Sequence, residues 1–129
     1  MSMWIPTLED VMRLHTKVTC ASGGSDGVRE AGLVESALAR ASAGFGGVEL
    51  YPDLVGKAAA IGAGLTHNHG FIDGNKRIGV MTMLLMLRRN GIRLRYTQQE
   101  LIDLSLQMAQ GKAGVEEADA WIRGHQVQL

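Results

Sequence analysis

The chain has 129 residues, of which 46% are hydrophobic, and its 13 Lys and Arg balance its 13 Asp and Glu. This length and composition fit one globular domain, residues 1–129, that can bury a core without the support of disulfides or metals. The zero formal net charge argues against direct nucleic-acid binding and against a membrane-surface protein, because both normally need an excess of basic residues.

Targeting and redox signals point to the cytoplasm. Cys20 is the single cysteine, so no intrachain disulfide can form and we expect a free thiol. The first 16 residues lack the basic and apolar regions of a signal peptide. The longest nearly apolar run, residues 78–87, is shorter than the roughly 20 residues that span a bilayer.

The first half of the chain is expected to hold three helices. The first begins after Thr7, which can cap it, and is followed by a glycine-containing loop at residues 20–27. The second covers about residues 29–41 and is followed by a loop at residues 42–51. The third covers about residues 53–68, where one apolar face is formed by Leu54, Ala58, Ile61 and Leu65.

The second half of the chain is expected to hold three more helices. The fourth covers about residues 75–90 and is apolar on nearly every side, which is typical of the buried centre of a bundle. Residues 92–96 could be extended. Thr97 and Glu100 form a capping box for a fifth helix that ends near residue 110, and a sixth covers about residues 115–123. The sequence therefore predicts an all-α bundle of about six helices around the fourth helix.

The densest cluster of reactive side chains lies in residues 67–77, on the loop that joins the third and fourth helices. Gly74, Asn75 and Lys76 form the expected first turn of the fourth helix. The unpaired N–H groups and the dipole at such a turn favour an anion, and phosphate is its natural occupant. Lys76 and Arg77 add positive charge, and an Arg side chain can grip phosphate with two parallel hydrogen bonds.

The same loop carries groups suited to catalysis. Asp73 precedes the anion site, and a single carboxylate beside phosphates is a usual protein ligand of Mg²⁺. His69 lies four residues earlier, and an imidazole can act as a general base near neutral pH. Phe71 is expected to anchor the loop in the core. These components fit phosphoryl or nucleotidyl transfer, in which catalysis is mostly positioning and charge stabilisation.

Residues 69–77, HGFIDGNKR, closely resemble the motif of the Fic/Doc family in its death-on-curing (Doc) form, H-x-F-x-[DN]-[AG]-N-K-R. Residues 23–40, 45–54 and 87–91 also resemble stretches typical of Doc toxins, so the resemblance covers nearly the whole chain. It implies the small all-α Fic/Doc fold, with the active loop at the N-terminus of the buried helix. It also implies that the protein uses ATP and Mg²⁺.

The family has two branches with different reactions. The Fic branch transfers AMP from ATP to a hydroxyl of a target protein, and its motif has Gly at the position of Lys76. The Doc branch has Lys there and acts as a protein kinase, with elongation factor Tu as the known target and arrested translation as the result. The resemblance thus implies transfer of the γ-phosphate to a Thr or Ser hydroxyl.

The resemblance also implies roles for single residues. His69 would be the base on the target hydroxyl, Asp73 would hold Mg²⁺, and Phe71 would anchor the loop. The phosphate cradle would be lined by Gly74, Asn75 and Lys76, with Arg77 stabilising phosphate charge.

Three departures from the wider family bear on these roles. Val80 stands where the Fic motif has a second Arg, which weakens an AMP-transfer reading. Gly70 replaces a frequent Pro, which loosens the loop without removing a reactive group. No inhibitory [ST]-x-x-x-E-[GN] segment is found in the sequence. Control is therefore expected from a cognate Phd-like antitoxin whose C-terminal segment folds onto the toxin.

Two other functions and several structural roles are also compatible with the sequence. The protein could be a Fic-type AMP transferase, or a catalytically idle module that only binds its antitoxin. His67 could suit the helix dipole or support the active site, and a zinc site with His69 is disfavoured because helical residues two apart do not share a face. His15 and His125 are expected on the surface. The pair Arg88 and Arg89 is expected to be solvated, where it could help to receive an acidic antitoxin segment.

Overall fold

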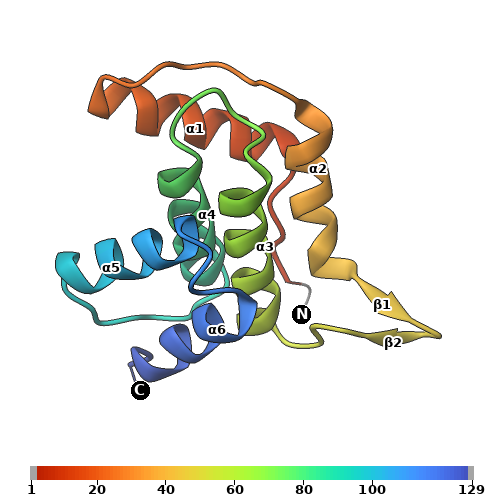
Figure 1. Ribbon diagram of the computed structural model, residues 1–129. Helices are drawn as coiled ribbons and strands as arrows, with labels where there is room; N and C mark the ends of the chain where they lie inside the picture. Colours follow the sequence, from red (N-terminus) through yellow and green to blue (C-terminus); the bar gives the residue numbers. More distant parts are fainter. Residues whose placement is uncertain (1–2, 128–129) are drawn as a thin grey trace.

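The computed structural model describes residues 3–127, so the ends of the predicted domain, residues 1–2 and 128–129, lie outside the described residues. Helices dominate this part of the chain, as Figure 1 shows, and only one short hairpin interrupts them. The all-α prediction is therefore confirmed. The elements in chain order are α1 (Leu8–Ser22), α2 (Ala31–Ala39), the 3₁₀ turn η1 (Arg40–Ser42), β1 (Gly44–Phe45), β2 (Val48–Glu49), α3 (Leu54–Asn68), α4 (Asn75–Arg89), α5 (Gln98–Ala109) and α6 (Val115–Gly124).

The predicted helix starts are found at both capping boxes. The Thr7 hydroxyl accepts from the Asp10 N–H, and the Asp10 carboxylate accepts from the Thr7 N–H. Thr97 and Glu100 repeat this exchange at the start of α5. The predicted loop that began at residue 20 is wrong by three residues, because α1 continues until Gly23 adopts a left-handed conformation with φ 75°.

Helix α3 is the most completely buried element. Its residues from Val55 to Thr66 are all buried, and it packs against α2, α4, α5 and α6. Helix α4 is buried on one side only, and Met81 remains 38% exposed. The centre that the sequence assigned to α4 is thus shared with α3, whose many Ala and Gly residues let neighbours approach on every side. Within residues 3–127, none of the helices is both long and apolar enough to cross a membrane.

Two glycines bring α3 and α4 into close contact. A Cβ atom on Gly79 would lie 2.7 Å from the carbonyl oxygen of Gly62, and one on Gly62 would lie 3.2 Å from the carbonyl oxygen of Gly79. Backbone therefore packs on backbone at this crossing, which leaves no room for a side chain. The reactive loop joins these two helices, so the crossing sets the positions of both ends of that loop.

The stretch expected to be a loop before α3 contains a β-hairpin. β1 and β2 are antiparallel, with Gly44 opposite Glu49 and Phe45 opposite Val48. The connecting Gly46 and Gly47 both have positive φ (59° and 82°), which is what a tight two-residue hairpin turn requires. The buried Lys57 ammonium ties the hairpin to α3 by donating to the Glu49 carboxylate at 2.8 Å and to the Ala41 carbonyl at 2.6 Å.

Candidate active site

The loop between α3 and α4 begins at His69, which is exposed. His69 ends α3 in the left-handed conformation, with φ 53° and ψ 47°. It is the only non-glycine residue with positive φ among residues 3–127. This conformation costs a residue with a Cβ atom about 1–2 kcal/mol, so surrounding contacts must hold it.

Residues 27–30 run alongside this loop and hold its backbone. The His69 carbonyl accepts two hydrogen bonds from the Arg29 guanidinium, from Nε at 2.9 Å and from Nη2 at 2.7 Å. The Gly70 carbonyl accepts from the backbone N–H groups of Arg29 and Glu30, both at 2.9 Å. The Ile72 N–H donates in turn to the Gly27 carbonyl at 3.1 Å.

Phe71 and Asn75 form the inner side of the loop. Phe71 is 2% exposed and belongs to the hydrophobic core. Its N–H donates to the Asn75 side-chain oxygen at 3.0 Å, and its carbonyl accepts from the Asn75 amide at 2.9 Å. The Asn75 side chain is therefore engaged with the loop, and its backbone N–H is the group left to line an anion site.

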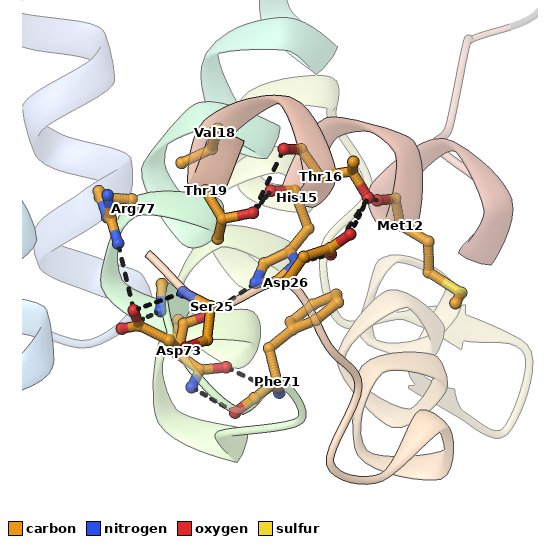
Figure 2. Close-up of polar contacts among 12 residues, drawn as sticks. Met12, His15, Thr16, Val18, Thr19, Ser25, Asp26, Phe71, Asp73 and Arg77 are labelled. Carbon is orange, nitrogen blue, oxygen red and sulfur yellow. Dashed lines mark hydrogen bonds and ion pairs between the residues drawn. The ribbon is translucent and has the colours of Figure 1, made fainter. Parts of the chain in front are cut away.

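His15 of α1 packs against the loop. The expectation that it lies on the surface is wrong, because His15 is 1% exposed. Its ring stacks on Phe71, its Nε2 lies 2.6 Å from the Asp73 carbonyl, and its Nδ1 faces the Asp26 carboxylate at 3.4 Å (Figure 2). A carbonyl only accepts hydrogen bonds, so Nε2 must be the donor.

Asp73 has the properties that a Mg²⁺ ligand needs. The Ser25 N–H donates to its carboxylate at 3.2 Å and the Gly74 N–H at 2.8 Å. Figure 2 labels Ser25 beside the Asp73 carboxylate. These donors, first that of Ser25, lower the pKa of Asp73 below its ordinary value, which keeps it ionised. The side chain is 47% exposed, so solvent and a nucleotide-bound cation can reach it.

Positive groups follow Asp73 at the start of α4. Gly74 begins α4 with φ 81° and no side chain caps the helix, so the N–H groups of its first turn can face an anion. Lys76 is exposed. Arg77 lies 3.9 Å from Asp73 and also contacts the Ser22 hydroxyl.

The segment after α1 lies directly on these groups. A Cβ atom on Gly24 would be 2.7 Å from the Asp73 carboxylate and 3.1 Å from the Arg77 guanidinium. Only a residue without a side chain fits there while Asp73 and Arg77 keep their positions. The loop after α1 therefore forms one wall of the candidate site.

His67 has a structural contact. Its Nε2 lies 2.9 Å from the Met108 carbonyl, which joins the end of α3 to the end of α5. Within residues 3–127, no three His, Cys, Asp or Glu side chains come together as a metal site would require. His67 therefore makes a contact between helices, which fits the structural one of the two roles that the sequence left open.

His125 is also more enclosed than the sequence suggested. Its side chain is only 21% exposed, and its ring stacks on Trp121 with a centroid distance of 4.2 Å.

Cys20 is an exposed free thiol, as expected. The Arg89 guanidinium lies 4.7 Å from the centre of the Trp4 ring, a cation–π contact that the sequence did not predict.

Sequence reasoning missed three contributors to the site, namely Arg29, His15 and the Gly24–Ser25 segment. A signal was present for His15, which is spaced by four residues from both Val11 and Thr19 on the buried face of α1. No such signal existed for Arg29, because its partner is a backbone carbonyl 40 positions away.

Comparisons with known proteins show what this chain is similar to. A family model described as the Fic/DOC family matches residues 5–87. Over 86 residues the chain is 42% identical to a protein named Toxin Doc from Mycolicibacterium smegmatis, and the match covers 67% of this chain and 64% of that protein, slightly less than two thirds. Over 107 residues it is 32% identical to a protein named Protein kinase doc from Escherichia phage P1, covering 83% of each chain.

Proposed function

The chain belongs to the Fic/Doc family, and from this premise we propose that it is a Doc-type toxin kinase that transfers the γ-phosphate of ATP to a Thr or Ser hydroxyl of a target protein. The observation that carries the proposal is Lys76 within the intact sequence HGFIDGNKR. Two matches support it, since one relative is named a toxin and the other a protein kinase.

Lys76 and Val80 favour phosphoryl transfer over transfer of AMP. In the Fic branch, a Gly stands at the first position and an Arg at the second. This chain therefore has an extra cation beside the cradle and lacks one in the next turn of α4. Both differences match the Doc form, in which the nucleotide binds in the reversed orientation and presents its γ-phosphate.

The proposed reaction gives each site group one task. His69 takes the proton of the target hydroxyl while the hydroxyl oxygen bonds to the γ-phosphorus and the bond from that phosphorus to the bridging oxygen of ADP breaks. The N–H groups at the start of α4, together with Lys76 and Arg77, stabilise the charge on the phosphate oxygens. Phe71 keeps the loop in place from the core.

Asp73 is the group that would hold Mg²⁺. Its carboxylate is ionised and half exposed, and hydrogen bonds from Ser25 and Gly74 orient it. When bound with the nucleotide, Mg²⁺ supplies neutralisation of phosphate charge. The donor set of one carboxylate fits this ion, which usually keeps several waters.

The proposed partners follow from the same family. The target is elongation factor Tu, and its modification arrests translation in the cytoplasm. A Phd-like antitoxin neutralises the toxin through a C-terminal segment that folds onto it. Support for an antitoxin comes from the relative named a toxin, together with the lack of an inhibitory motif in this sequence.

The test is a labelling experiment with two forms of ATP. Purified protein, freed from antitoxin, is incubated with Mg²⁺ and a bacterial lysate, and ATP carries the label at either the γ- or the α-phosphate. His69→Ala is the control. We expect one protein band labelled only from the γ position and absent with the variant, and mass spectrometry of that band identifies the target.

Other outcomes would contradict the proposal in different ways. Label from the α position would make the protein an AMP transferase despite Lys76. No label from either position would favour a module that only binds its antitoxin. Growth arrest that survives His69→Ala would show that chemistry at the loop is not its cause.

A further inference from the structure

Arg29 makes two charge-assisted hydrogen bonds to one carbonyl. Its Nε and Nη2 lie 2.9 and 2.7 Å from the carbonyl oxygen of His69. A guanidinium presents two adjacent N–H groups in one rigid plane, so both can reach the same oxygen. A Lys ammonium is a point donor on a flexible chain and cannot reproduce this geometry.

The backbone of the same segment holds the next peptide. The N–H groups of Arg29 and Glu30 both donate to the Gly70 carbonyl at 2.9 Å. Consecutive carbonyls, those of His69 and Gly70, are thus held from one side by one short segment. The peptide plane between His69 and Gly70 cannot turn without breaking the hydrogen bonds to Arg29.

His69 needs such a restraint more than its neighbours do. It is exposed and left-handed, so neither burial nor its own backbone preference keeps it in place. In contrast, Phe71 is buried and Asp73 is held through His15. The direction of the His69 side chain is set by its backbone angles, and these depend on the carbonyl that Arg29 holds.

We propose that Arg29 is a positioning residue that holds the backbone of His69 in the left-handed conformation from which its imidazole reaches the target hydroxyl. The proposal rests on the proposed function for the use of His69 as a base. It adds a group that lies outside residues 69–77 and that touches neither the nucleotide nor the hydroxyl in this role.

The first test observes the contact without any reaction. Histidine labelled with ¹³C at the carbonyl gives one signal for each of the four histidines, and His69→Ala identifies that of His69. We expect Arg29→Ala to move the His69 carbonyl signal upfield, the direction expected when hydrogen bonds to a carbonyl are lost. The signals of His15, His67 and His125 should stay in place. An unmoved His69 signal would overturn the proposal.

The second test separates positioning from folding. In the labelling reaction, Arg29→Ala should lower kcat about tenfold or more because the base is misplaced, while KM for ATP changes less than about twofold. Millimolar guanidinium should restore part of the kcat of Arg29→Ala and none of that of His69→Ala. Arg13→Ala is the control, since Arg13 is an exposed Arg whose carboxylate partner lies on α1.

The outcomes separate this inference from the proposed function. An unchanged kcat in Arg29→Ala, or a loss that follows the fraction of unfolded protein and is not rescued by guanidinium, would overturn the positioning role. If the wild-type protein transfers no label, the proposed function fails. The role of Arg29 as a positioner of a base then fails with it, and the carbonyl signal still shows whether Arg29 holds the His69 backbone.

Discussion

The imidazole of His15 stacks on the ring of Phe71, with a centroid distance of 3.8 Å and an interplanar angle of 13°. The same imidazole donates to the Asp73 carbonyl at 2.6 Å. One buried side chain of α1 thus contacts the loop at two residues, the ring of Phe71 and the backbone of Asp73, whose carboxylate lies at the candidate Mg²⁺ site. The position of Asp73 therefore depends on α1 as well as on α3 and α4.

Replacing His15 with Phe tests this dependence. The new ring can still stack on Phe71, but the Asp73 carbonyl loses its donor. A carbonyl that loses its hydrogen-bond donor inside the protein costs about 1–3 kcal/mol. The free energy of unfolding measured in urea should therefore fall by that amount. The rate of phosphate transfer should fall as well. Lys17→Ala is the control on the exposed face of α1. Equal stability and rate in His15→Phe and wild type would contradict the dependence.

The crossing of α3 and α4 predicts a strong effect of Gly79→Ala. The new Cβ would lie 2.7 Å from the Gly62 carbonyl oxygen, so the two helix backbones must separate. Overpacking of this kind costs about 1–3 kcal/mol, measurable as a lower midpoint of unfolding in urea. The matched control is Gly32→Ala on the exposed side of α2, where nothing lies within 4 Å of the new atom. For Gly32→Ala we expect the free energy of unfolding to rise by about 0.4–1 kcal/mol. A fall in Gly32→Ala as large as that in Gly79→Ala would refute the argument from the helix crossing.

The pair formed by His125 and Glu100 predicts a dependence of stability on pH. The two ring nitrogens of His125 face only acceptors, the Trp121 carbonyl at 2.7 Å and the Glu100 carboxylate at 2.8 Å. The doubly protonated ring satisfies both, and the Glu100 hydrogen bond, followed by that of the Trp121 carbonyl, raises the pKa of His125 above its ordinary value of 6.5. The hydrogen bond from His125, followed by those from the backbone and side chain of Thr97, lowers the pKa of Glu100 from 4.5 to about 2.

The signs of these two pKa shifts define the pH range in which the pair of His125 and Glu100 stabilises the fold. A raised pKa in the folded state gives stability that is complete below pH 6.5 and is lost as the pH rises through the folded-state pKa. The lowered pKa of Glu100 gives stability that is present above pH 4.5 and is lost as the pH falls toward 2. His125→Ala should therefore reduce the free energy of unfolding more at about pH 5.5 than at about pH 8.5. Glu100→Gln keeps a capping side chain and should remove most of this pH difference, and a difference that persists would point to another group.

Local rules account for what the sequence predicted well. Capping boxes at Thr7 and Thr97 and the left-handed stop at Gly23 act within a few residues of the helix ends, so these boundaries were found to within three residues. The loop between α3 and α4 could be placed for a related reason, since its residues are adjacent in sequence and the N-terminus of α4 follows directly.

Contacts between distant segments account for what the sequence did not predict. Arg29 meets His69 across 40 positions and His15 meets Asp73 across 58. His15 shares its spacing with the buried Val11 and Thr19, but its contact with Asp73 joins segments that only the fold brings together. The hairpin at residues 44–49 was also missed, because strands of two residues carry too few positions to show an alternating pattern.

Gly24 provides a test of the wall that the loop after α1 forms beside Asp73. Its backbone is outside the left-handed region, so Ala fits the conformation, but its Cβ would lie 2.7 Å from the Asp73 carboxylate and 3.1 Å from the Arg77 guanidinium. These are side-chain ends at a surface, so we expect Gly24→Ala to change the free energy of unfolding by less than about 0.5 kcal/mol. Displacing the carboxylate should raise the Mg²⁺ concentration for half-maximal transfer about tenfold, as loss of a supporting contact does at other metal sites. Ser25→Ala is the control, because it retains the backbone N–H that donates to Asp73. An unchanged Mg²⁺ requirement in Gly24→Ala would show that the position of this carboxylate does not limit the use of the metal.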